Sequence, residues 1–195
     1  MTAESSLGRT RNRTTLLLIA AVFVAPIVLA WLFASGILGL GDRARTNHGQ
    51  LVTPPVDLRT LPPPSGAVPL LKLQPADWAV VYVTAGVCDE ACAQHLQTLE
   101  VVRSLAGKEA TRLSVFGLAA EEGPGAPQGG PRILVDKAFV AALGTTLAGR
   151  PSPPAFPLHA FVDWRGQLMM TFPADAPPAD IKSDLVRLLR ASAIK

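Results

Sequence analysis

The chain has 195 residues, a formal net charge of +3 at pH 7 and a hydrophobic content of 49%. Its basic residues form no stripe interleaved with aromatic side chains, which excludes a nucleic-acid-binding surface. Two cysteines are present, so any thiol chemistry of this chain has to take place at that pair.

The segment Leu16–Phe33 holds consecutive uncharged and almost wholly apolar residues, interrupted by Pro26. About 20 apolar residues cross the hydrocarbon core of a bilayer, so we predict a single transmembrane anchor over residues 16–38. A cleaved signal peptide is the alternative. Its apolar region would be shorter, about 7–15 residues, and the sequence Val28-Leu-Ala30 is a poor cleavage site.

Charges flank this apolar segment unequally. Arg9, Arg11 and Arg13 precede it, and the first charge after it is Asp42. Because Lys and Arg are retained on the cytoplasmic side, this distribution predicts a cytoplasmic N-terminus over residues 1–15 and an extracytoplasmic remainder. We therefore expect a single-pass protein of a bacterial inner membrane whose C-terminal domain is periplasmic, where disulfides persist.

Residues 39–75 form a predicted tether, because Pro, Gly and small polar residues dominate this stretch. Proline lacks a backbone N–H and interrupts helices, and it recurs in the segments Thr53–Pro55 and Leu61–Gly66. Whether the part that begins at Asn47 packs on the folded domain stays open on the sequence alone.

Residues 76–195 form the predicted folded domain, in which apolar runs indicate strands and helical spacing of apolar residues indicates helices. The expected order is strand 78–84, helix 88–105, strand 113–119, loop 121–131, helix 133–147, strand 158–163, turn 164–166, strand 167–172 and helix 179–192. This order describes one α/β domain with a mixed central sheet. A cysteine pair at the first strand-to-helix junction makes it the thioredoxin plan.

Cys88 and Cys92 follow the first apolar strand and open the first predicted helix. Residues at i and i+4 share one helix face, with Cα atoms about 6 Å apart, which is within the range of a disulfide. The same pair is able to clamp a soft metal ion, and a helix N-terminus favours the thiolate that both reactions need. A structural disulfide, or two buried inert cysteines, is the alternative interpretation.

The chain resembles the thioredoxin-like superfamily and, within it, the SCO/SenC branch of cytochrome c oxidase assembly proteins. The C-x-x-x-C pair behind a membrane anchor and the later sequence Phe161-Val-Asp163-Trp-Arg-Gly166 carry this resemblance. It implies a factor for assembly of a respiratory haem–copper oxidase that handles copper(I) or keeps the copper-ligand thiols reduced. The implied partners are the bilayer and an oxidase subunit or another copper or thiol protein, and no nucleic acid.

Three positions depart from the SCO pattern. Asp89 and Ala93 stand where the family has prolines after the two cysteines. Ala155 stands where the family has its copper-binding histidine. The third copper ligand therefore has to come from another position.

Copper(I) prefers thiolate, thioether and imidazole ligands. Beside Cys88 and Cys92, His159 is the best candidate for the third ligand, and His95 is the second candidate. The alternatives are a satisfied core position for His159 and a solvent-facing position for His95. His48, in the tether, has the weakest case.

A second resemblance, to TlpA-like thiol oxidoreductases, rests on Pro157, which precedes the strand that ends at Asp163. These enzymes have a cis-proline before that strand, facing the cysteines. The resemblance implies an enzyme in which Cys88, exposed at the helix tip, is the nucleophile, Cys92 is the resolving thiol and Pro157 is the cis-proline. An ordinary proline-rich loop and a non-catalytic assembly scaffold with a fixed disulfide are the alternatives.

Overall fold

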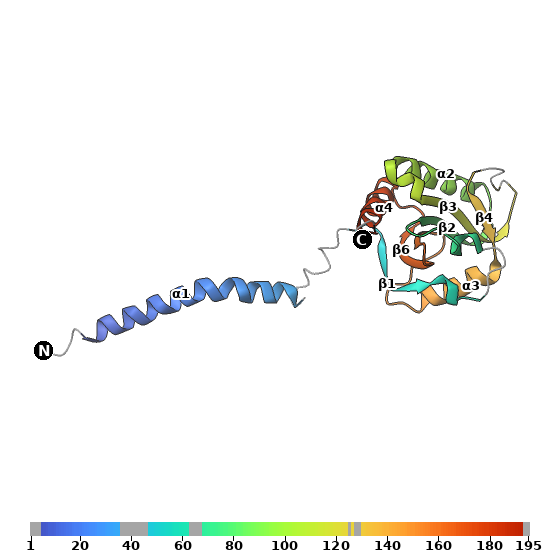
Figure 1. The fold of residues 1–195 in the computed structure, drawn as a ribbon. Helices are drawn as coiled ribbons and strands as arrows, with labels where there is room; N and C mark the ends of the chain where they lie inside the picture. Colours follow the sequence, from blue (N-terminus) through green and yellow to red (C-terminus); the bar gives the residue numbers. More distant parts are fainter. Residues whose placement is uncertain (1–4, 36–46, 63–67, 125, 127–129, 193–195) are drawn as a thin grey trace. The chain divides into compact units, whose positions relative to one another are not determined.

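The computed structural model describes residues 5–35, 47–62, 68–124, 126 and 130–192, without the side chains of 5–14, 16–17 and 33–34 (Figure 1). The chain divides into two compact units, Met1–Thr46 and Asn47–Lys195. Each unit is a separate body, and the functional residues predicted above all lie in the second.

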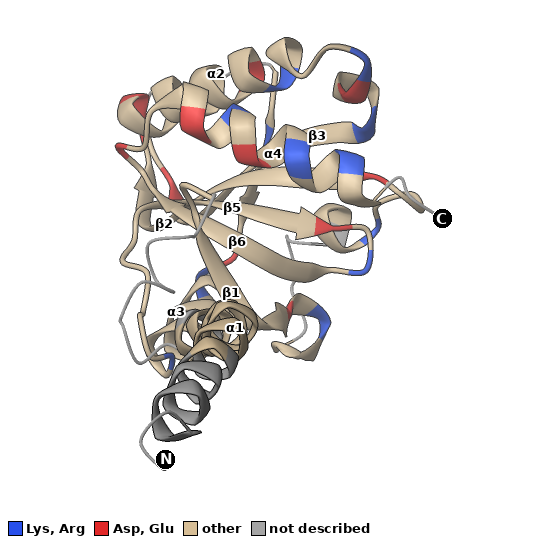
Figure 2. Ribbon diagram, turned by 90° about the vertical axis from the view of Figure 1, so that its left-hand side faces the viewer, with Lys and Arg blue, Asp and Glu red and all other residues tan. Residues whose placement is uncertain are grey.

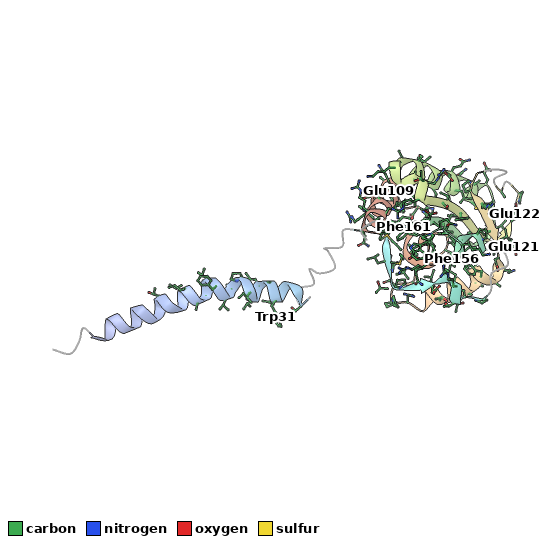
Figure 3. All side chains as sticks on the ribbon, viewed as in Figure 1. Trp31, Glu109, Glu121, Glu122, Phe156 and Phe161 are labelled. Atoms are coloured by element: carbon green, nitrogen blue, oxygen red, sulfur yellow. A yellow bond between two sulfur atoms is a disulfide. The ribbon has the colours of Figure 1, made fainter. Side chains whose placement is uncertain are left out.

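The first unit contains helix α1 (Ser5–Ala34), with Pro26 inside it. Large apolar side chains of α1 are exposed along its length, from 46% at Val28 to 71% at Phe23 (Figure 3). Among the residues that the structure describes, no helix is both long and apolar enough to cross a membrane. Residues 36–38, the end of the predicted anchor, lie outside the described residues.

The second unit is built on a six-stranded mixed sheet with the order β1-β6-β5-β2-β3-β4. Strand β2 is central and pairs in parallel with β3, which pairs in parallel with β4. On its other side β2 pairs antiparallel with β5, and β6 and β1 continue that half antiparallel. The strands are β1 (Gln50–Asp57), β2 (Trp78–Cys88), β3 (Leu113–Glu122), β4 (Arg132–Val135), β5 (Leu158–Asp163) and β6 (Gln167–Pro173).

Helices cover both faces of this sheet. Helix α3 (Lys137–Ala148) lies on one face, and α2 (Glu90–Leu105) and α4 (Pro178–Ser192) lie on the other (Figures 1 and 2). Short 3-10 helices occupy Leu58–Thr60, Val68–Leu71 and Gly107–Arg112.

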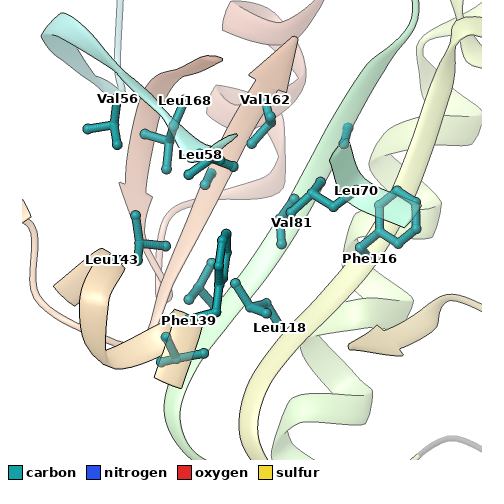
Figure 4. Packing of buried hydrophobic residues seen from close by; sticks show 14 of the residues in the cluster. Val56, Leu58, Leu70, Val81, Phe116, Leu118, Phe139, Leu143, Val162 and Leu168 are labelled. Carbon is teal, nitrogen blue, oxygen red and sulfur yellow. The ribbon is translucent and has the colours of Figure 1, made fainter. Parts of the chain in front are cut away.

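Strand β2 is apolar on both faces because each face is buried under helices. Its odd-numbered side chains, such as Val81, pack with α3 in the cluster drawn in Figure 4. Its even-numbered side chains, such as Tyr82, pack with α2 and α4. Strand alternation therefore decides which residues of β2 and β5 can reach α2, the helix that carries Cys92.

A tight turn joins β5 to β6, as expected for residues 164–166. The Asp163 carboxylate accepts hydrogen bonds from the backbone N–H groups of Arg165 (2.9 Å) and Gln167 (2.8 Å). Gly166 has φ +76°, a left-handed conformation that glycine adopts without steric cost. The sequence Asp-x-x-Gly thus fixes a hairpin that sets the register of β5.

Three predicted element boundaries are wrong. The predicted helix 133–147 begins only at Lys137, because residues 132–135 form strand β4 beside β3 and the Asp136 carboxylate caps the helix after them. The predicted tether 39–75 contains strand β1 at the sheet edge. Cys88 ends β2 and does not open α2. Within the predicted tether, residues 39–46 and 63–67 lie outside the described residues.

Candidate redox site at the start of helix α2

Cys88 and Cys92 are joined by a disulfide, with their Cα atoms 5.1 Å apart. Cys88 is the last residue of β2, and Cys92 lies in the first turn of α2. The bond therefore links the end of the central strand to the start of the following helix. The prediction that this spacing permits a disulfide is confirmed.

Asp89, between strand and helix, is the N-cap of α2. Its carboxylate accepts hydrogen bonds from the backbone N–H groups of Ala91 (3.0 Å) and Cys92 (3.2 Å). These N–H groups are among those that would otherwise stabilise a thiolate at the helix N-terminus. A negative charge now occupies that position, so the cap opposes formation of a second negative charge on a cysteine sulfur.

Both cysteines are buried. Cys88 is 0% exposed and Cys92 is 2% exposed, so the prediction of an exposed Cys88 at the helix tip is wrong. The reason is that β2 continues through Cys88, which pairs with Glu122 of β3, and the Cys88 carbonyl accepts a hydrogen bond from the N–H of Gly123 (3.0 Å). An attacking thiolate can reach the disulfide only after this junction opens.

Three aromatic rings meet on the face of the sheet that α2 covers. The Tyr82 ring stacks on the His95 ring, with centroids 4.6 Å apart and an interplanar angle of 11°. His159 lies 5.7 Å from Tyr82 and 5.5 Å from His95, ring centroid to ring centroid. Tyr82 and His159 are direct partners in the β2–β5 register, so the sheet itself sets their contact.

His159 is 1% exposed, and neither of its ring nitrogens has a hydrogen-bond partner among the described residues. Burial, and secondarily the nearby His95, lowers the pKa of His159 to about 4. Burial also lowers the pKa of His95. Both imidazoles are therefore neutral at pH 7. His95 is half-buried and stacked, so it is not a solvent-facing residue. His159 has no hydrogen-bond partner among the described residues, so it is not a satisfied core histidine.

The hydroxyl of Tyr82 titrates at a pKa raised above its ordinary value, first by burial and then by the negative charge of Asp89. The charge of Asp89, the N-cap of α2, therefore acts on the cluster of rings formed by Tyr82, His95 and His159. Neither Tyr82 nor the capping role of Asp89 is anticipated by the sequence reasoning. The signal for Tyr82 is its even position in β2, and the signal for Asp89 is an N-cap residue type directly before a helix.

The four predicted copper ligands do not form a metal site in this arrangement. Among the described residues, no group of three or more His, Cys, Asp or Glu side chains is placed to hold a metal ion. The sulfurs of Cys88 and Cys92 are bonded to each other, so they are not thiolate ligands. The donor set does not fit a resident copper centre unless the disulfide is first reduced.

The Phe156–Pro157 peptide bond is cis, in agreement with the resemblance to TlpA-like oxidoreductases. Pro157 is exposed and directly precedes Leu158, which pairs with Val83 of β2. Its proximity to Cys88 stays a prediction. His48 lies elsewhere, beside Asp180 and Asp184 of α4.

Comparisons with known proteins agree with the fold. A model of the family "Transmembrane-like, thioredoxin-like, C-terminal domain" matches residues 78–192, and a model of the family "Transmembrane-like, N-terminal domain" matches residues 7–36. Among curated proteins, none matches this chain.

Solved structures similar to the chain include two Sco proteins and a lipoprotein thioredoxin. Apo Sco1 from Thermus thermophilus has 14% identity and a TM-score of 0.42, with 76% of this chain and 98% of that chain covered. Copper-bound ScoI from Bradyrhizobium japonicum has 14% identity and a TM-score of 0.36, with 58% and 85% covered. The exposed lipoprotein thioredoxin Etrx1 of Streptococcus pneumoniae has 17% identity and a TM-score of 0.36, with 60% and 85% covered.

The thioredoxin-like family model spans more than half of the chain, from the start of β2 to the end of α4. The chain therefore belongs to the family of transmembrane-like proteins with a thioredoxin-like C-terminal domain.

Proposed function

We propose that this protein is a membrane-anchored, SCO-like thiol–disulfide factor that acts on the copper-ligand thiols of a respiratory haem–copper oxidase during its assembly. The observation that carries the proposal is the Cys88–Cys92 disulfide at the junction of the central strand and α2. These are the two cysteines of the chain, so the chain has one dithiol–disulfide couple and no other.

Helix α1 supports anchoring in a bilayer. Its large apolar side chains from Leu18 to Trp31 are exposed in the part of the chain that the structure describes, and an N-terminal transmembrane-like family model matches residues 7–36. The arginines at positions 9, 11 and 13 favour a cytoplasmic N-terminus in a bacterial inner membrane. The thioredoxin-like domain would then work in the periplasm, facing periplasmic thiols.

The reaction is a two-electron exchange between dithiols and disulfides. In the reduced protein, the Cys88 thiolate attacks one sulfur of a substrate disulfide, forms a mixed disulfide and displaces the other substrate sulfur as a thiolate. The Cys92 thiolate then attacks Cys88, which releases the second substrate thiolate. The substrate gains two electrons and two protons, and the protein is left with its Cys88–Cys92 disulfide until a dithiol reductant restores it.

A second candidate is a non-catalytic assembly scaffold with a fixed disulfide, and the burial of both cysteines favours it. The two candidates differ in reduction potential, because structural disulfides have potentials below about −300 mV and exchange-active ones lie higher. We would equilibrate the full chain in lipid nanodiscs with dithiol redox buffers and count free thiols by alkylation and mass spectrometry. A midpoint above about −300 mV supports exchange, and a lower one supports the scaffold.

Trapping identifies the nucleophile. The variant Cys92→Ser should accumulate a mixed disulfide with a peptide that carries an oxidised pair of copper-ligand cysteines, while Cys88→Ser should not. Cys88→Ser is the matched control, since each variant keeps one thiol. Equal trapping by both variants would contradict the assigned roles.

Copper(I) enters this proposal as cargo of the reduced state. Reduction would free two thiolates, and the His159 nitrogens, which have no hydrogen-bond partner among the described residues, are the candidate third donor. The test is titration of the reduced protein with copper(I) against a competing chelator, alongside Cys88→Ala, His159→Ala and His95→Ala. Equimolar binding that is lost with Cys88 and weakened with His159 supports copper handling, and no binding above the variants restricts the function to thiol exchange.

A further inference from the structure

A groove of about 670 Å³ lies between the C-terminal end of α2 and the outer side of α4, remote in sequence from the cysteines. Its apolar floor includes Val186 and Leu105, and the Leu105 side chain is 54% exposed. Every charged residue that lines it is basic: Lys182, Arg187 and Arg190. The basic positions on α4 appear blue in Figure 2.

The acidic residues of α4 are held away from this groove. Asp184 is 1% exposed, and its carboxylate accepts hydrogen bonds from the backbone N–H groups of His48 (2.6 Å) and Gly49 (2.8 Å). Asp180 lies 3.7 Å from Nε2 of His48. Segment 47–49 therefore holds the Asp184 carboxylate, and neither Asp180 nor Asp184 lines the groove.

Another cavity among the described residues has a different electrostatic character. It is lined by both signs of charge, with Asp77 and Glu100 beside Lys72 and Arg132, and Glu100 pairs with Arg103 at 2.7 Å. A cavity of mixed charge does not select anions. Of these two cavities, the groove on α4 is the one whose charged lining residues are all of one sign.

A short stretch of chain separates the proposed membrane anchor from segment 47–49, which is bound to α4. Residues 35–46 join the end of α1 to Asn47, and a fully extended chain of twelve residues spans at most about 43 Å. His48 and Gly49, directly after this connection, are hydrogen-bonded to Asp184 of α4. With α1 anchored, the length of the connection therefore sets an upper limit on the distance between Asn47 and the headgroups of the bilayer.

We propose that this groove docks on the anionic phospholipid surface of the membrane in which α1 is anchored. The inference rests on the anchoring part of the proposed function. Clustered Lys and Arg side chains are attracted to anionic headgroups over about a Debye length, and the apolar floor at Leu105 and Val186 can contact the glycerol region beneath them. Lipid phosphate groups match the groove because they are negatively charged and lie at the surface of the membrane that would hold α1.

The test uses the full chain with its native disulfide intact, so that an added cysteine is the one free thiol. A fluorophore at Ser183→Cys reports on the groove, and one at Thr145→Cys on α3, on the opposite face of the sheet, is the control. The chain is reconstituted in vesicles of phosphatidylglycerol with phosphatidylethanolamine, or of phosphatidylcholine alone. Both contain a trace of lipid with a nitroxide on its headgroup as quencher.

We expect stronger quenching at position 183 than at position 145 in the anionic vesicles, and loss of that difference in high salt or in phosphatidylcholine. The double charge reversal Lys182→Glu with Arg190→Glu should lower the equilibrium constant for docking by roughly tenfold or more. The control variant, Lys72→Glu with Arg132→Glu, changes the net charge equally but at the cavity of mixed charge. It should leave the docking equilibrium unchanged. Circular dichroism verifies that each variant is folded.

Two further observations separate failure of the inference from failure of the proposed function. If alkaline carbonate releases the chain from the vesicles, the anchoring is wrong and the inference falls with it. If the chain resists extraction but positions 183 and 145 are quenched equally, the inference is overturned while the anchoring stands. Equal salt sensitivity of the two double variants would also overturn it.

Discussion

His159 is a buried imidazole whose two nitrogens have no partner among the described residues, and such a group costs free energy of folding. It lies against the stacked rings of Tyr82 and His95, and His95 belongs to the helix that carries Cys92. A polar ring in this place contributes less to stability than an apolar ring of similar shape would. Its presence is consistent with a chemical role in the reduced state.

Replacement of His159 by Phe should make folding stability less dependent on pH. The folded-state pKa of about 4 lies below the ordinary value of 6.5, so between these values the unfolded chain binds a proton that the folded chain does not. The free energy of unfolding therefore rises with pH through this window, and the titration of His159 accounts for about 3 kcal/mol of that rise. Denaturant unfolding of the 47–195 domain at pH 4 to 6.5 would measure this dependence. An equal slope in wild type and His159→Phe would contradict the assignment.

Tyr82 is the one tyrosine of the chain, so the absorbance of its phenolate reports its titration directly. Its pKa should lie above 10 in wild type and fall in Asp89→Asn, because the variant removes a nearby negative charge but retains a capping oxygen. Asp89→Ala should lower this pKa as well and, in addition, cost about 1 kcal/mol of stability through loss of the cap. A Tyr82 titration that is identical in all three proteins would exclude the electrostatic link.

The sequence predicts the proximity of the two sulfurs but not their burial. Spacing is a local property, and i and i+4 positions near a helix start come close in many arrangements. Burial depends on the pairing of Cys88 with Glu122 and on the loop that follows β3. These contacts join residues more than thirty positions apart, and no pattern around Cys88 encodes them.

Among the elements, the long strands and helices follow from periodicity, whereas β1 and β4 do not. Strand β4 has four residues, too few for an alternation to be recognised. Strand β1 contains Pro54 and Pro55, which indicate a loop. They are accommodated because β1 is an edge strand and its register with β6 shifts between Leu51 and Val56.

The contact between α4 and the start of the domain is a further element that the sequence does not reveal. Asp184→Ala should lower the unfolding free energy by about 2–4 kcal/mol, because it leaves the N–H groups of His48 and Gly49 without their acceptor. Asp184→Asn retains one carbonyl oxygen and should lose less. Chemical denaturation of the 47–195 domain measures both. An alanine variant as stable as wild type would show that this contact does not hold the segment.

At the scale of the whole molecule, the order of elements is sufficient to predict a thioredoxin-like domain with a mixed sheet. Two parallel strands around the first helix and an antiparallel hairpin afterwards leave few possible sheets. The arrangement of Tyr82, His95 and His159 is beyond this level of prediction. It requires the register of β5 on β2 together with the rotation of α2 about its axis.

The full chain should resist alkaline extraction from bacterial membranes, and a reporter fused after Lys195 should be active in the periplasm. The apolar segment Leu16–Phe33 and the arginines before it provide the physical reason. Replacing Arg9, Arg11 and Arg13 by Glu should raise the fraction of inverted chains, and the reporter measures this fraction. A chain that alkaline carbonate releases completely would contradict the anchor.

The fastening of residues 47–49 to Asp184 also has a mechanical consequence. If α1 is anchored in a bilayer as proposed, tension from it would enter the domain at Asn47, ahead of the first β1–β6 pair, Gln50 with Thr171. Pulled from its end, an edge strand in an antiparallel pair would open one pair of hydrogen bonds at a time. Here such a force would meet the two hydrogen bonds on Asp184 first, and they would share it. In the proposed anchored protein, this contact would shield the sheet that holds the cysteine pair from movements of α1.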